Sequence, residues 1–177
     1  MDIKAEQGSV MISEQQWQNA KCVCNAGLFS SLHYAIASVD NQGLPHITPI
    51  GSLMLGDLID GQAQACYFER FTKQLPANAK HNTSICILAV NSSKWFWFKS
   101  LLKGQFSHQP AVRLIGQLGP LRPATDSEIQ RWQRRVKPLR FTKGHKLMWQ
   151  SMSHVRDITI TEVKAVSIGK MTQQSMN

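Results

Sequence analysis

One loop carries residues of the kinds that bind phosphate. In the stretch RFTKQLPANAKHN, residues 70–82, Pro76 predicts a short helix, because proline is favoured in a first helical turn, where its missing N–H is harmless. Thr72, Lys73 and Gln74 then lie in the loop just before the start of this helix. A hydroxyl, an ammonium group and free backbone N–H groups suit an anion such as phosphate. Taken alone, the loop still favours the alternative of an ordinary loop with an exposed lysine.

A second stretch has polar and cyclic residues where a structural strand would not need them. SVDNQGLPHITPIGSLML, residues 38–55, has the pattern of strand, tight turn and strand, with turn residues at 40–43. The second strand carries His46, Thr48 and Pro49 in its middle. Proline is tolerated in a strand only where a ladder N–H is not needed. This strand is therefore unusual, and its residues make it a candidate for function.

Neither the cysteines nor the histidines have the spacing of metal ligands, and we expect no metal. Cys22 and Cys24 lack a second pair at zinc-ligand distance, while Cys66 and Cys86 lie in apolar, strand-like runs. This favours reduced thiols packed as small hydrophobic groups. Together with the missing signal-peptide core and the short apolar runs, reduced thiols lead us to expect a cytoplasmic protein.

The elements that must position these residues are mostly strands. Capping boxes at Ser13–Gln16 and Thr125–Glu128 predict helices over about 14–26 and from 125 to about 137. Alternating or β-branched runs predict six strands, at 32–39, 44–55, 62–69, 84–90, 111–123 and 155–168. Six strands with few helices favour a mainly β fold, in which antiparallel hairpins close into a small barrel with flanking helices. We expect one domain over residues 1–177.

Charge is distributed unevenly along the chain. Residues 1–93 hold five Lys/Arg and seven Asp/Glu, a net charge of −2, whereas residues 94–177 hold fifteen and four, a net charge of +11. A strongly positive half indicates an anionic partner, such as a phosphate-bearing ligand, nucleic acid or a membrane surface. A solvated basic face is the alternative, and charge alone does not exclude it.

Three segments in order resemble one known family. GLPHITPIG, then YFERFTKQLPANAKHN, then VRLIGQLGPL are together similar, over roughly residues 25–125, to the pyridoxamine 5'-phosphate oxidase-like FMN-binding split-barrel family. The resemblance implies a homodimer of six-stranded antiparallel split barrels. It also implies that FMN is the cofactor and lies in the groove between the two subunits.

The same resemblance implies which residues bind FMN. The strand at 44–51 would run along the flavin ring, and the run after the third strand would hold the phosphate. Gln74 stands where the family has a lysine, which Lys80 or an arginine of the second subunit could replace, and Ala111 stands where the oxidases have a glutamine. The C-terminal Arg-x-His element of the true oxidase has no match, so oxidation of pyridoxamine phosphate itself is not expected. The implied cofactor-binding residues are His46, Thr48, Pro49, Ile50, Tyr67, Thr72, Lys73, Gln74 and Arg113.

An aromatic and basic insert follows the fourth expected strand. SSKWFWFKSLLKGQFSHQP, residues 92–110, is longer than a hairpin needs and mixes large apolar residues with lysines. It could be a wall of the flavin groove, a dimer contact or a basic amphipathic segment at a membrane surface. Packing in an interface or core is the simplest of these interpretations.

The expected function is that of a flavin-dependent oxidoreductase on a small substrate, with an anionic one favoured by the basic half. The redox chemistry would belong to the flavin, and no residue demands the role of a general acid or base, so no catalytic residue is named. The alternative is a non-enzymatic protein that binds or senses flavin or haem. Nucleic-acid binding ranks last, because the aromatic residues do not alternate with Lys/Arg along a strand face.

Overall fold

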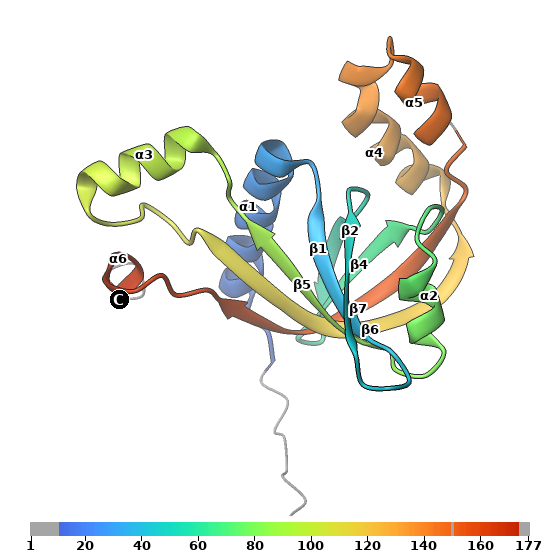
Figure 1. The fold of residues 1–177 in the computed structure, drawn as a ribbon, viewed down its shortest axis with the longest axis horizontal. Helices are drawn as coiled ribbons and strands as arrows, with labels where there is room; N and C mark the ends of the chain where they lie inside the picture. The colour runs from blue at the N-terminus through green and yellow to red at the C-terminus, as the bar shows by residue number, and fades with distance from the viewer. Residues whose placement is uncertain (1–10, 150, 174–177) are drawn as a thin grey trace, which may run out of the picture.

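The computed structural model describes residues 11–149 and 151–173 as one antiparallel sheet with helices around it. The strands are β1 (Tyr34–Val39), β2 (Pro45–Ile50), β3 (Met54–Ile59), β4 (Gln62–Phe68), β5 (Ser84–Val90), β6 (Ala111–Pro123) and β7 (His154–Ala165). The helices are α1 (Glu14–Ser31), α2 (Gln74–Ala79), α3 (Lys94–Lys103), α4 (Asp126–Val136), α5 (Lys143–Met148) and α6 (Lys170–Gln173), with a 3-10 turn η1 at Lys137–Leu139. Figure 1 shows the strands running side by side in a curved sheet.

The sheet has seven strands in the order β2-β1-β5-β6-β7-β4-β3, so the expectation of six strands is wrong. The long strand expected at 44–55 breaks at Gly51–Leu53, and its halves β2 and β3 form opposite edges of the sheet. Ser52 stabilises the break, because its hydroxyl accepts from the Phe68 N–H at 3.1 Å and contacts the Phe68 carbonyl at 3.3 Å. Within the described residues no ladder joins β2 to β3, so the sheet is mainly β and antiparallel as expected but is not a closed barrel.

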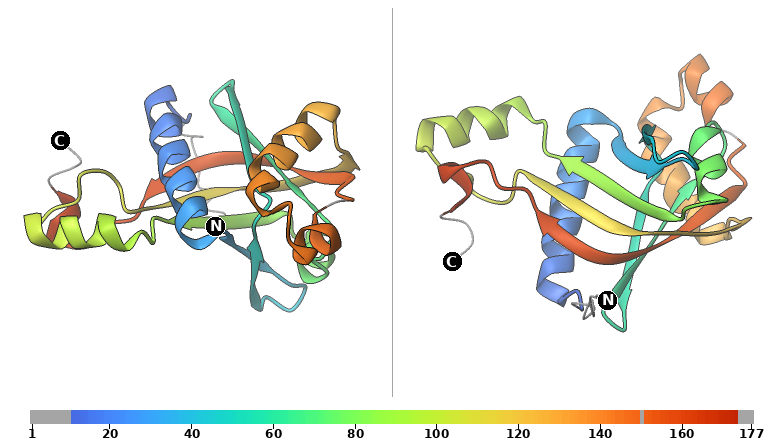
Figure 2. Two further views of the ribbon diagram at one scale, coloured as in Figure 1. Left: turned by 90° about the horizontal axis from the view of Figure 1, so that it is seen from above. Right: turned by 60° about the horizontal axis from the view of Figure 1, so that its bottom comes forward.

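The sheet curves around helix α1. The Ser13–Gln16 capping box forms as predicted, and the helix continues to Ser31, beyond the expected end near residue 26. Its buried face contacts β1, β3, β5, β6 and β7, and the Trp17 indole donates to the Gly56 carbonyl at 3.2 Å. Figure 2 shows α1 across one side of the sheet. Strands β6 and β7 approach closely at Gly116, where a Cβ would collide with the Thr159 carbonyl oxygen of β7.

A helical lobe of α4, η1 and α5 lies between β6 and β7 in the chain. The Thr125–Glu128 capping box starts α4 as predicted. Trp132 and Val136 on α4 pack into a second hydrophobic cluster with side chains of β3, β4 and β7. Arg131 and Arg135 donate to the carbonyls of Leu55 and Leu53, at 2.9 and 2.7 Å. These contacts attach the lobe to the edge of the sheet.

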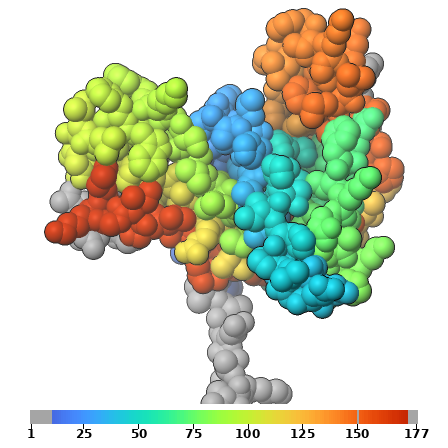
Figure 3. Space-filling view, in the orientation of Figure 1, coloured from blue at the N-terminus to red at the C-terminus, as the bar shows by residue number. Residues whose placement is uncertain are grey.

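The insert at 92–110 forms helix α3 and a return loop. Figure 3 shows α3 and the α4–α5 lobe as two separate projections from the body of the molecule. Phe96 and Trp97 pack against Phe106, with ring centroids 5.6 and 5.2 Å apart. By contrast, four large apolar side chains of α3 point to solvent: Trp95, Phe98, Leu101 and Leu102. Among the described helices, none combines the length and the apolar character needed to cross a bilayer.

Candidate functional site

Strand β2 is an edge strand, which explains its prolines. It pairs with β1 on one side only, with Pro45 opposite Val39 and Pro49 opposite Ala35. A proline in an edge strand costs no ladder hydrogen bond when its nitrogen faces away from the sheet, as it does in a non-hydrogen-bonded pair. The other side of β2 therefore offers free backbone groups to a ligand or to a second chain.

The side chains of β2 alternate between two faces. His46 and Thr48 are half-buried and Ile50 is buried in the main core, whereas Ile47 and Pro49 are exposed on the opposite face. Thr48, Pro49 and Ile50 therefore do not present their side chains to the same face. A flat ligand along this strand would meet the backbone together with the side chains of one face only.

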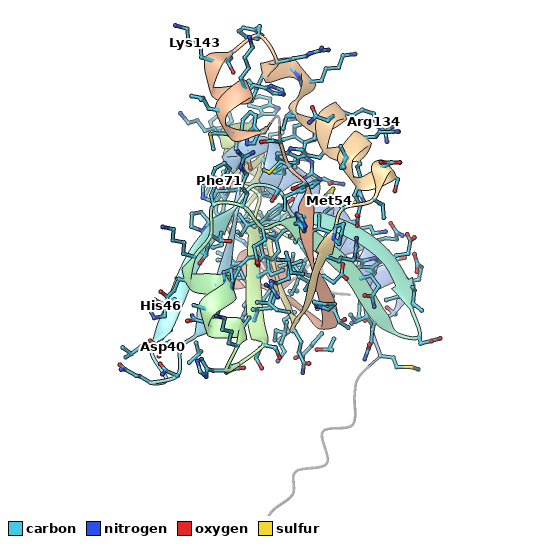
Figure 4. All side chains as sticks on the ribbon, turned by 90° about the vertical axis from the view of Figure 1, so that its right-hand side faces the viewer. Asp40, His46, Met54, Phe71, Arg134 and Lys143 are labelled. Atoms are coloured by element: carbon cyan, nitrogen blue, oxygen red, sulfur yellow. The ribbon has the colours of Figure 1, made fainter. Side chains whose placement is uncertain are left out.

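His46 has a structural partner within its own hairpin. Its Nε2 lies 3.0 Å from Asp40 Oδ2, while Asp40 Oδ1 accepts from the backbone N–H groups of Gln42 and Leu44, both at 2.9 Å. These hydrogen bonds, with that of His46 the largest effect, lower the pKa of Asp40. In Figure 4 Asp40 and His46 lie together at the far end of the β1–β2 hairpin. His46 thus stabilises the turn.

The loop after β4 contains an unsatisfied hydroxyl. Thr72 Oγ1 is buried and has no hydrogen-bond partner among the described residues, and the neighbouring Lys73 is exposed and forms no ion pair with them. Helix α2 begins at Gln74, so Pro76 lies in its first turn as predicted, but Gln74 is the first helical residue and not part of the loop as expected. Gln74 donates to Asn78 Oδ1 at 2.8 Å, and Asn78 donates to Ser38 of β1 at 2.9 Å. The Gln74 side chain thus has a partner within the protein, whereas the Thr72 hydroxyl and the Lys73 ammonium group have none among the described residues.

Tyr67 is a core residue that starts a buried polar chain. Its ring is fully buried and its hydroxyl donates to Glu69 Oε2 at 2.6 Å. Arg156 of β7 donates to both oxygens of Glu69, at 2.5 and 2.8 Å, and to the Gly119 carbonyl at 3.0 Å. Burial, together with the bond to Glu69, raises the pKa of Tyr67. The sequence pattern singled out Tyr67 but gave no sign of Glu69 or Arg156, because their pairing spans 87 positions.

A cavity of about 480 Å³ lies next to this chain of contacts. Arg70 crosses one side of it and donates to the carbonyl and to the hydroxyl of Ser151, with 3.0 Å to the carbonyl oxygen. The cavity is lined by Glu69, Arg70, Leu121, Ser151, Met152, Ser153 and His154. Arg70 and Ser151 were not among the predicted site residues. Arg70 lies only two positions before Thr72, so the sequence did show a second positive residue next to the predicted phosphate-binding loop.

Arg113 lies away from the Thr72–Lys73 loop. It is exposed on β6, opposite Leu88 of β5 and Lys164 of β7. The β4 end that leads to this loop instead adjoins the other end of β6, because Val155 pairs with both Phe68 and Arg122. One chain therefore does not bring Arg113 to the loop. The described residues also contain no group of three His, Cys, Asp or Glu side chains that could hold a metal ion.

Comparison with known proteins supports the assignment of the fold but does not assign a function. The sequence matches no protein-family model and no curated protein. Among solved structures, an FMN-binding protein from Syntrophomonas wolfei subsp. wolfei has a TM-score of 0.53 at 15% identity, covering 87% of this chain and 90% of that one. The HupZ protein from Group A Streptococcus has a TM-score of 0.52 at 17% identity, covering 86% and 98%. The chain thus has an antiparallel fold similar to that of these two proteins.

Proposed function

We propose that this chain binds flavin mononucleotide through the loop after β4 and the edge strand β2. The observation that carries the proposal is the buried, unpartnered Thr72 Oγ1 beside the exposed Lys73. A phosphate oxygen would accept from this hydroxyl, and the ammonium group of Lys73 would offset its charge. The similarity of the fold to that of an FMN-binding protein supports the same assignment.

The two ends of the flavin would meet different parts of the chain. Thr72 and Lys73 would hold the phosphate, and the free edge of β2 near Thr48 and Pro49 would lie along the ring. His46 would act on the site indirectly, by holding the hairpin through Asp40. Bound FMN would supply electron transfer, while the protein orients the ring and limits access of water to it.

We further propose that the functional unit is a homodimer. Phe29 at the end of α1 is 87% exposed, and Trp95, Leu101 and Leu102 are exposed on α3. The segment that leads into α3 is joined to α1, because the Ser92 N–H donates to the Ser30 hydroxyl at 2.9 Å. An apolar surface of this kind is typical of an interface. In a dimer, Arg113 of one copy would be available to the flavin groove of the other.

The reaction that best suits this arrangement is flavin-dependent oxidation or reduction of a small substrate, with an anionic one favoured by the +11 charge of residues 94–177. A non-enzymatic flavin-binding protein would use the same site without a substrate. Reduction of the bound flavin by a nicotinamide donor, followed through its absorbance, separates the two: turnover supports an oxidoreductase, and a flavin that stays oxidised supports the binder.

Binding itself is tested first. The purified chain should show a flavin absorption spectrum, with the released compound identified by mass as FMN. Protein that lacks flavin should bind added FMN more tightly than riboflavin, which has no phosphate. A chain that binds neither compound, or binds both equally, would contradict the phosphate assignment.

A further inference from the structure

The helical lobe contains a second cavity, separate from the candidate flavin site. It has a volume of about 590 Å³ and lies between the end of α4, the turn η1 and the helix α5. Figure 4 shows this lobe with Arg134 and Lys143 labelled on its two helices, well apart from His46 on β2. The residues that line the cavity are Gln133, Arg134, Lys137, Arg140, His145 and Lys146.

The lining of this cavity is positive and unbalanced. Its two arginines and two lysines form no ion pair within residues 11–149 and 151–173, and no Asp or Glu lines the cavity. The negative end of the α4 dipole accounts for some positive charge in the last turn, where Arg134 lies. It does not account for Arg140 and Lys146, which lie beyond that helix. Four exposed cations around one cavity create a positive potential that favours a bound anion.

His145 adds an observation of a different kind. His145 is one of the residues around the cavity although it is only 6% exposed, and its buried Nε2 has no hydrogen-bond partner among the described residues. Its backbone N–H donates to Thr142 Oγ1 at 3.1 Å, and its ring packs nearly perpendicular to the Trp149 ring with centroids 5.9 Å apart. Buried polar atoms are nearly always paired, so an orphaned ring nitrogen beside a basic cavity indicates a missing partner.

We propose that this cavity binds a small molecule that carries two or more linked phosphate groups. Arginine and lysine side chains are the usual partners of phosphate oxygens, and His145 Nε2 can donate to one more oxygen when it carries the proton. The cavity has the size of a small-ligand pocket, since such pockets hold about 300–1,000 Å³. A single phosphate would leave most of the four cations unmatched, whereas a di- or triphosphate chain would engage several of them. The site uses none of the residues assigned to the flavin.

The test titrates the full chain with sodium triphosphate and, separately, with ATP, at about 50 mM salt where screening is modest. Calorimetry gives the affinity and stoichiometry, and tryptophan fluorescence reports on the site because Trp149 packs against His145. We expect saturable binding of one phosphate chain per protein chain. Equal affinities for the two probes would show that only the phosphate groups are recognised. A higher affinity for ATP would show that the site also contacts the nucleoside. Both results support the proposal.

Substitutions inside and outside the cavity test whether its lining residues bind the phosphate chain. Lys137→Gln and Lys146→Gln should each weaken binding by about tenfold or more, the effect of losing one charge-assisted contact. His145→Phe keeps a ring against Trp149 but removes the nitrogen, and should also weaken binding while the circular dichroism spectrum stays unchanged. Lys103→Gln on α3 removes the same charge from the other projection and should change affinity by less than about twofold.

Three results would overturn the proposal. The first is a lack of saturable binding of either probe. The second is a loss of affinity in Lys103→Gln as large as that in the cavity variants, because the attraction would then be a general effect of the basic half. The third is displacement of triphosphate by a short DNA duplex that binds more tightly and is weakened by the same variants, since the lobe would then be a nucleic-acid surface.

Discussion

Arg122 on β6 donates two hydrogen bonds to Glu128 in the first turn of α4, at 2.9 and 2.8 Å. The same guanidinium bonds Asp157 of β7 through its Nε, at 3.0 and 2.9 Å. Glu128 also accepts from the backbone N–H of Thr125 at 2.8 Å, which completes the capping box. One side-chain cluster therefore joins two strands to the start of the helical lobe.

This cluster predicts how stability depends on pH. The hydrogen bonds from Arg122 lower the pKa of Glu128 from 4.5 to about 2. Because the carboxylate is favoured in the folded state, its stabilisation is full above the unfolded pKa and is lost as the pH falls toward 2. Glu128→Gln should cost roughly 1–3 kcal/mol of unfolding free energy near neutral pH, and the deficit should shrink below about pH 4. Urea unfolding at several pH values measures this.

The matched control for this measurement is Glu162→Gln. Glu162 forms an exposed ion pair with Lys164 at 2.9 Å, and such pairs contribute about 0–1 kcal/mol. A deficit in Glu128→Gln that stays constant between neutral and acidic pH would show that Glu128 acts by packing or capping alone.

Lys73 is predicted to bind the phosphate of FMN. Lys73→Ala should weaken FMN binding by roughly 1.5–3 kcal/mol, the loss of one charge-assisted contact, and leave riboflavin nearly unaffected. Fluorescence titration with both flavins measures the difference. Lys170→Ala, an exposed lysine on α6, is the control of equal charge. If Lys73→Ala weakens both flavins alike, the residue does not hold the phosphate.

The exposed face of α3 is predicted to be part of a dimer interface. Leu101→Glu should shift the protein from dimer to monomer at micromolar concentration, because the side chain is 63% exposed in the single chain and a buried charge is costly. Sedimentation velocity gives the oligomeric state, and Gln105→Glu provides a polar control that adds the same charge nearby. A wild-type protein that sediments as a stable, flavin-loaded monomer would remove the prediction.

The cysteines are predicted to differ widely in reactivity. Burial raises the pKa of Cys24 and of Cys66 to about 12, so at pH 8 only roughly one thiol in ten thousand is the reactive thiolate. Cys22 is exposed and Cys86 half-buried. An aromatic disulfide reagent should therefore react quickly with Cys22 and with the two buried thiols only as the protein unfolds. Cys22→Ser should remove the fast phase, and rapid labelling of Cys24 or Cys66 in the native protein would contradict the structure.

Arg113 is predicted to attract an anionic electron donor to the flavin of the second copy. Bound flavin should be reduced faster by an anionic donor than by a neutral one of matched potential, and the preference should fade as salt screens the charges. Arg113→Ala should reduce the preference, and Lys164→Ala, its exposed neighbour on β7, tests whether any positive charge on this face suffices. Equal rates for both donors at every salt concentration would leave the basic half without a role in the reaction.

Features that depend on neighbours in the chain could be predicted from the sequence. The capping boxes at Ser13 and Thr125 start helices because the partners lie three residues apart. Pro76 begins its helix for the same local reason, and Pro49 indicated a strand without full pairing, which β2 is. The alternation of apolar residues was sufficient for most strands, since most strands bury one face against the main core, whereas β4 buries residues of both faces in two clusters. The roles of Thr72, Lys73 and Arg113 in binding remain predictions.

Features that depend on distant parts of the chain appeared only in the folded molecule. The stretch 44–55 reads as one strand, yet it breaks at Ser52 because that hydroxyl satisfies the backbone of Phe68, sixteen positions away. Glu69 becomes a buried carboxylate because β7 brings Arg156 to it. The orphaned nitrogen of His145 and the surrounding cations form a cavity only once α4, η1 and α5 pack together. Local patterns encode hydrogen bonds between near neighbours, whereas the partner of a buried polar group is decided by which strands and helices the core brings into contact.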